Sequence, residues 1–198
     1  MDWHEAIGIL AAILQIGAVI PYVRAMLRGS VRPNLVSWSL WTLSVLISLF
    51  AQVSAGPSWS LLILITATLA NLTVIFLGAI GYSYRRFGIP EGACLLLSLA
   101  AMLLWQITSN PLIALGFAIA ADAIAYIPTL IKTYRDPASE MAFWWFMLAL
   151  VGTLSAISTT KIDFANLAFP VYYGLVNLAL AALIIWRKNV LDVRAARG

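Results

Sequence analysis

The sequence predicts an all-α membrane protein in which seven transmembrane helices form two parallel three-helix repeats joined by a linker helix. Three observations carry this prediction: the composition, the spacing of the apolar stretches and an internal similarity. Of the 198 residues, 63% are hydrophobic and 10% are charged, whereas a soluble domain has about 45–50% apolar and about 25% charged residues. Such a chain cannot cover itself with polar side chains. We therefore expect it in a membrane, by preference the plasma membrane, which in a bacterium is the inner membrane.

The apolar stretches between charged residues, prolines and glycines define the expected helices in order. A helix needs about 20 apolar residues to cross a hydrocarbon core of about 30 Å. Asn110-Pro111 separates the fourth stretch from the fifth, because Asn is a favoured cap and proline suits a first helical turn. The seven expected spans are Ala6–Leu27, Leu35–Ala55, Ser58–Tyr82, Gly92–Thr108, Pro111–Tyr134, Met141–Thr159 and Phe164–Trp186.

The basic residues predict the orientation of these spans. Seven crossings place the connections 28–34, 83–91 and 135–140 and the C-terminal tail on one side. Eleven of the twelve Lys and Arg residues lie on or beside that side, and only Lys161 lies on the other. By the positive-inside rule the N-terminus is outside and the C-terminus is in the cytoplasm. An interfacial aromatic belt is also expected, since tryptophans occur near the ends of the spans: Trp3, Trp38, Trp41, Trp59, Trp105, Trp144, Trp145 and Trp186.

The chain resembles itself when it is shifted by about half its length. An offset of 107 residues, or 106 for the last pair, aligns Pro21 with Pro128, Arg28 with Arg135, Trp38 with Trp145, Ser48 with Ser155 and Asn71 with Asn177. The expected organisation is therefore a first repeat over 1–84, a linker helix within 85–110 and a second repeat with a basic tail over 111–198. Because a single helix separates two triplets, both copies enter the membrane in the same direction, which is the arrangement of parallel repeats.

These motifs resemble a known family. Pro21-Tyr22 is followed by Arg28-Gly29-Ser30-Val31-Arg32-Pro33 and Ser37-Trp38, and a looser copy runs from Pro128 to Trp145. With an Asn in the third helix of each copy, the chain looks like a member of the PQ-loop/SWEET superfamily in its 3+1+3 helix form. The resemblance implies alternating-access movement of small polar solutes, sugars in one branch and amino acids in another.

Polar residues in the middle of the spans are the candidate site, because they are costly there and usually face the bundle interior. Asn71 and Asn177 are expected to contact solute, although hydrogen bonds between helices would also explain them. Gln15 matches Asp122 at the same offset of 107. The full set of predicted substrate-binding residues is Asn71, Asn177, Asp122, Gln15, Ser48 and Tyr173.

Asp122 is the one acid expected at mid-membrane. Three roles are open for it: carrying a proton during transport, pairing with a cationic solute, or donating a structural hydrogen bond in its protonated form. Pro21 and Pro128 interrupt their helices at equal depth near the cytoplasmic ends. Since proline frees a backbone carbonyl and permits a kink, we expect them to be hinges.

The function predicted from these features is transport of a small polar solute, sugar-like first and amino acid or amine second. No enzyme activity, cofactor or metal is expected, because the chain has one cysteine, Cys94, and one histidine, His4. Alternatives are a seven-helix receptor on the same scaffold, or a nicotinamide-riboside-type vitamin transporter. That family shares the helix layout, and Trp38 and Trp41 lie three residues apart in this sequence. The expected partners are the solute and membrane lipids, without nucleic acid. Proton coupling and a homo-oligomer stay open.

Overall fold

The computed structural model describes residues 2–83 and 87–195, and this part of the chain is all-helical, as predicted. Short connections join the helices, with one turn of π-helix at Gly78–Tyr82 and one turn of 3₁₀-helix at Pro137–Ser139. The α-helices of the described residues are α1 (Trp3–Leu27), α2 (Leu35–Ala55), α3 (Leu61–Leu77), α4 (Ile89–Thr108), α5 (Pro111–Arg135), α6 (Ala142–Ile157) and α7 (Phe164–Ala195).

Five helical segments of the described residues are long and apolar enough to cross a membrane. They comprise α1, α2, α3 with the turn that follows it, α5 and most of α7. The α6 helix is apolar but has 16 residues, and α4 contains a shorter apolar segment, Glu91–Ala100. The chain is therefore a membrane-embedded helical protein, while the count of seven crossings stays a prediction.

Local chemistry explains where the helices begin and end. The side chain of Asn34 accepts a hydrogen bond from the Val36 backbone at 3.2 Å, and Asn110 caps α5 in the same way. The α3 helix ends at Leu77, before the predicted Tyr82, and Gly81 then adopts a φ of +121° that favours glycine. The α7 helix continues past the predicted Trp186 to Ala195.

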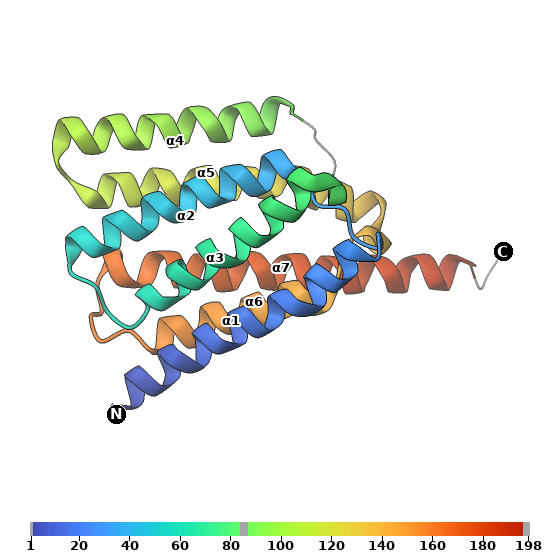
Figure 1. The fold of residues 1–198 in the computed structure, drawn as a ribbon, viewed down its shortest axis with the longest axis horizontal. Helices are drawn as coiled ribbons and strands as arrows, with labels where there is room; N and C mark the ends of the chain where they lie inside the picture. Colours follow the sequence, from blue (N-terminus) through green and yellow to red (C-terminus); the bar gives the residue numbers. More distant parts are fainter. Residues whose placement is uncertain (1, 84–86, 196–198) are drawn as a thin grey trace.

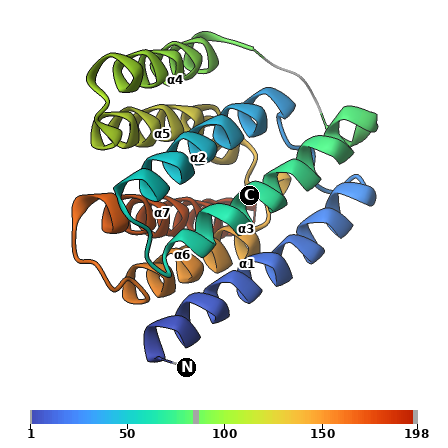
Figure 2. The same ribbon diagram turned by 60° about the vertical axis from the view of Figure 1, so that its left-hand side comes forward.

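The helices lie side by side with their axes roughly aligned (Figure 1). The α4 helix forms one edge of the bundle and packs against α5 and α2. The α1 helix packs mainly against α6 and α3, whereas α5 packs against α2 and α7 in addition to α4. Figure 2 shows the first three helices in front of α5, α6 and α7. We call the end where α1 begins the N-terminal end, and the opposite end, where α7 projects, the C-terminal end.

Basic residues gather at the C-terminal end of the bundle. Arg187 illustrates the packing there, because its guanidinium lies 4.2 Å from the ring centre of Tyr134 and donates to the Tyr134 carbonyl at 2.9 Å. Arg85, Arg86 and Arg197, which entered the orientation argument, lie outside the described residues. Pro21 and Pro128 lie inside α1 and α5, toward this end.

Candidate functional site

A small cavity lies in the centre of the bundle, where helices from both halves of the chain meet. Its volume is about 20 Å³, enough for about one water molecule. Residues from α2, α3, α5, α6 and α7 line it: Trp38, Trp41, Val45, Ala67, Asn71, Asp122, Tyr126, Trp144, Trp145, Leu148 and Tyr173. We call this space the central cavity.

Four tryptophans line the central cavity, and for these the prediction of an interfacial belt was wrong. Trp38, Trp41, Trp144 and Trp145 are between 1% and 6% exposed. They occur near helix starts, as predicted, but their rings pack inward against one another. Trp3 and Trp59 are exposed near helix ends, and Trp186 is exposed near the end of the apolar part of α7, which fits a belt. The side chain of Trp105 lies outside the described part of the structure.

The aromatic rings form a continuous wall. Trp41 lies 4.8 Å from Tyr126 between ring centres, and Trp145 lies 5.9 Å from Tyr126 and 6.2 Å from Trp41. Trp38 extends the wall, because its ring centre lies 5.6 Å from that of Trp41 and 6.3 Å from that of Trp144. Aromatic faces carry negative electrostatic potential, which attracts a cation placed over them.

Asp122 contributes a carboxyl group to this aromatic wall. Its side chain is 3% exposed and accepts a hydrogen bond from the hydroxyl of Tyr172 at 2.7 Å. The indole nitrogen of Trp41 donates to the backbone carbonyl of Asp122 at 3.3 Å, which joins α2 to α5. The site thus combines a buried acid with several aromatic faces.

The two predicted asparagines occupy different surroundings. Asn177 is fully buried; its side chain accepts from the Tyr126 hydroxyl at 3.2 Å and donates to the Tyr173 carbonyl at 2.7 Å. Asn71 is half-buried on the cavity lining, and its amide has no hydrogen-bond partner among the described residues. Asn177 therefore supports the aromatic wall from behind, while Asn71 presents its amide to the cavity.

The remaining predicted site residues, Tyr173, Gln15 and Ser48, differ in whether they reach the cavity. Tyr173 lines it, and the amide nitrogen of Gln15 lies 3.4 Å from the Tyr173 hydroxyl. The Gln15 amide oxygen is buried without a partner in the described structure. Ser48 is also buried, but its hydroxyl donates to the Ser44 carbonyl in the same helix at 2.9 Å.

A network of neutral polar groups closes the N-terminal end. Its members, which we call the N-terminal seal, are Gln52, Ser58, Ser60, Thr159 and Asn166. The Gln52 amide donates to the Ser60 hydroxyl at 3.0 Å and to the Asn166 amide oxygen at 3.2 Å. The hydroxyls of Ser58 and Thr159 are 2.9 Å apart. These contacts fasten the connection after α2 to the connection before α7.

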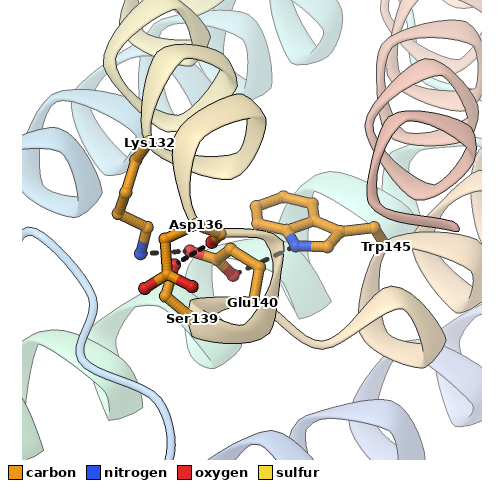
Figure 3. A network of polar contacts seen from close by, with 5 residues as sticks. All are labelled: Lys132, Asp136, Ser139, Glu140 and Trp145. Atoms are coloured by element: carbon orange, nitrogen blue, oxygen red, sulfur yellow. Dashed lines mark hydrogen bonds and ion pairs between the residues drawn. The ribbon is translucent and has the colours of Figure 1, made fainter. Parts of the chain in front are cut away.

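An ion pair holds the α5–α6 connection at the C-terminal end of the bundle (Figure 3). One carboxylate oxygen of Glu140 lies 2.6 Å from the ammonium of Lys132 at the end of α5. The other accepts a hydrogen bond from the Trp145 indole at 3.2 Å. Glu140 is 4% exposed. The contact therefore links an ion pair at the edge of the bundle to a ring that lines the central cavity.

Sequence reasoning did not identify several residues of this site. The four tryptophans were assigned to the belt, although the pairing of Trp38 with Trp145 in the two halves was the same signal that selected the asparagines. Tyr172 and Glu140 carried no such signal. Within the described residues, no group of three His, Cys, Asp or Glu side chains has the arrangement of a metal site.

Comparisons with models of protein families, with curated proteins and with solved structures found no match to this chain.

Proposed function

We propose that this protein is a seven-span membrane transporter that moves a small organic cation by alternating access around the central cavity. The carrying observation is the composition of that cavity. A carboxyl group, Asp122, faces a space lined by Trp41, Tyr126 and Trp145, with rings from both halves of the chain. A buried charge requires a partner, and a cation between a carboxylate and aromatic faces satisfies both groups.

The packing of the helices supports the proposal of two parallel repeats. If α1 corresponds to α5, α2 to α6 and α3 to α7, the contact of α1 with α6 is equivalent to that of α5 with α2. Likewise, the first helix of each triplet packs against the third. The gathering of basic residues at one end supports the proposed orientation, with the N-terminus outside and the C-terminus in the cytoplasm.

The closed ends support alternating access. The N-terminal seal links two connections at one end, with Asn166 also bonded to the Asp163 carboxylate, and the pair of Lys132 with Glu140 holds the α5–α6 connection at the other end. A cavity with room for about one water molecule, closed at both ends, corresponds to an occluded state, and transport requires each end to open in turn. Pro21 and Pro128 lie in the helices that lead to the C-terminal end and are the proposed hinges.

Two other solute classes follow from particular features. Sugar is implied by the family resemblance, and Asn71 beside aromatic rings suits a hydroxylated ring. Nicotinamide riboside unites a pyridinium cation with a sugar, and the spaced pair Trp38 and Trp41 lines the cavity. A receptor on the same scaffold would bind its ligand without moving it.

The test begins with purified protein in detergent and a thermal-shift screen against amines, quaternary ammonium ions, nicotinamide riboside, amino acids and sugars. A cation present at about a hundred times its Kd stabilises the folded state by about 2.7 kcal/mol. We expect such stabilisation for the wild type and for Asp2→Asn, an exposed acid ahead of α1, but not for Asp122→Asn. Stabilisation by sugar alone, equal in all three proteins, contradicts the cation assignment.

Flux then separates a transporter from a receptor. The protein is reconstituted into vesicles with the radiolabelled cation that the screen returns. We expect the label inside the vesicles to exceed many equivalents of protein and to leak out when excess unlabelled cation is added outside. Uptake that stops at one equivalent contradicts transport and favours the receptor.

A further inference from the structure

A large apolar groove runs along the outside of the bundle between α5 and α7, separate from the central cavity. Its volume is about 1020 Å³, at the upper end of the usual range for ligand pockets, about 300–1,000 Å³. Ile119 of α5 and Leu167, Val171 and Leu175 of α7 are among its lining residues. The groove lies on membrane-spanning segments, so its open side faces hydrocarbon.

The groove extends from the N-terminal end to the depth of the acid. Its lining on α7 begins at Phe164, the first residue of the helix, and reaches Val176. At 1.5 Å per residue this is about 18 Å, more than half of a hydrocarbon core about 30 Å thick. A molecule that followed the groove would therefore arrive at mid-membrane.

Tyr172 connects the groove to the central cavity. Its side chain lines the groove, and its hydroxyl donates to the Asp122 carboxyl at 2.7 Å. Asp122 in turn lines the central cavity. Polar networks occupy both axial ends of the bundle, whereas on this lateral side the Tyr172 side chain stands between the groove and the acid.

We propose that the α5–α7 groove is a lateral entrance to the central cavity, gated by Tyr172, and that it takes the apolar arm of an amphipathic organic cation whose charge reaches Asp122. This inference rests on the proposed cation site and specifies the class of cation. The chemistry of the groove matches that class. Its walls are mostly apolar, with one acid, Asp163, beside the start of α7, and its inner end is a hydroxyl bonded to a carboxyl. A purely hydrophilic cation would gain no hydrophobic contact with such walls.

Gly116 supplies the variant that blocks the groove. It lines the groove on α5, and a Cβ added there would meet no atom within 4 Å. Gly116→Leu therefore places its side chain toward the groove from a position with room for the first carbon. Gly17→Leu in α1 is a matched control, because Gly17 is also helical and has the same open surroundings away from the groove. Val171→Phe, on the α7 wall of the groove, is a second blocking variant.

The first experiment measures access to Asp122 from the lipid and needs no transport. Full-length protein in lipid nanodiscs is treated with dicyclohexylcarbodiimide, which partitions into hydrocarbon, or with a water-soluble carbodiimide. The carboxyl O–H adds across one C=N bond of the reagent, and the adduct rearranges to a stable N-acylurea with no leaving group. Peptide mass spectrometry gives the modified fraction of Asp122, and Asp122→Asn identifies the peptide.

We expect the hydrophobic reagent to modify Asp122 at least about tenfold faster than the water-soluble one. Gly116→Leu and Val171→Phe should slow this reaction, Gly17→Leu should leave it unchanged, and Tyr172→Phe should accelerate it. Equal rates with both reagents, or rates that neither blocking variant changes, overturn the lateral entrance.

The second experiment measures the ligand class with two probes, tetraphenylphosphonium and tetramethylammonium, by titration calorimetry. We expect the wild type and Gly17→Leu to bind the first at least about tenfold more tightly and Gly116→Leu to lose that preference. If the wild type binds both probes with equal affinity, the proposal that the groove takes an apolar arm is overturned, but the proposed cation site is not. If the protein transports another solute but binds neither probe, the cation assignment itself is overturned. If binding depends on the groove but no flux is found, transport alone is overturned.

Discussion

The two halves of the chain align at an offset of 107 or 106 residues, yet they pack differently. In the second half, a Cβ added to Gly152 of α6 would lie 2.5 Å from the backbone nitrogen of Gly174 in α7. The position 107 residues before Gly152 holds Val45, which lines the central cavity, and the position 106 residues before Gly174 holds Thr68. The helices α6 and α7 thus meet backbone to backbone, whereas α2 and α3 are held apart by side chains.

The polar residues show the same contrast. In the second half, Asn177 is fully buried and bonded on two sides, whereas Asn71 in the first half is half-buried and faces the cavity. The second half, which carries Asp122, is therefore the more tightly packed. The first half is packed more loosely and leaves the amide of Asn71 available to a ligand. Equivalent positions in a repeat need not share a role.

The largest effect is expected where the second half is tightest. Alanine favours helix over glycine by about 1 kcal/mol, so a helical Gly→Ala change with space around it should stabilise. Gly152→Ala instead forces α6 away from α7, and overpacking of this kind costs about 1–3 kcal/mol. We expect a lower Tm in detergent, measured by the loss of monodisperse protein after heating.

Gly17→Ala is the control for this prediction, since its added Cβ meets nothing within 4 Å. It should hold or raise the Tm. If Gly152→Ala is as stable as Gly17→Ala, the two halves do not differ in tightness.

The asparagines should separate stability from binding. Asn177→Ala leaves the buried hydroxyl of Tyr126 without its acceptor, at a cost of about 1–3 kcal/mol, and should lower the Tm. Asn71→Ala should leave the Tm nearly unchanged and weaken solute binding. Parallel melting curves and titrations of both variants test this split. Equal destabilisation by both changes would show that Asn71 also holds the helices together.

The hinge prediction concerns the helices that lead each half to the C-terminal end. Replacing both Pro21 and Pro128 by Ala restores the interrupted backbone hydrogen bonds and should stiffen α1 and α5. We expect slower vesicle flux, by about tenfold for a barrier raised by about 1.4 kcal/mol, with little change in Kd. Flux equal to that of the wild type would mean that the prolines shape packing only. Each single variant reports which half moves.

The elements could be predicted closely from the sequence, because charges, prolines and capping residues mark the ends of apolar helices. The expected span Leu35–Ala55 coincides with α2, and Pro111 begins α5 as expected. One exception is the end of α7. This helix continues beyond the predicted Trp186 into a polar segment that includes Lys188, because no proline or glycine interrupts it there.

The sequence predicts how deep the site residues lie along their helices, but not in which direction their side chains point. Asp122, Asn71 and Tyr173 line the central cavity, yet a helix that is apolar on most of its surface gives no sign of its rotation. Tyr172 and Tyr173 are adjacent, and only the packed structure shows that the first bonds Asp122 and the second lies near Gln15. The inward direction of Trp38 and Trp145 likewise depends on tertiary packing.

The smallest effect is expected at Ser48, a predicted site residue that the structure places in a self-contained bond. Its hydroxyl donates to the Ser44 carbonyl, an acceptor that already serves the helix. Ser48→Ala removes no contact between helices and should change stability by less than about 0.5 kcal/mol and solute affinity not at all. Ser155→Ala is the informative partner, because Ser155 is the equivalent residue 107 positions later and donates across helices to the Ser60 carbonyl at 3.3 Å. It should lower the Tm measurably. A binding defect in Ser48→Ala would show that this hydroxyl turns toward the cavity when solute is present, and would make the first half more mobile than its packing indicates.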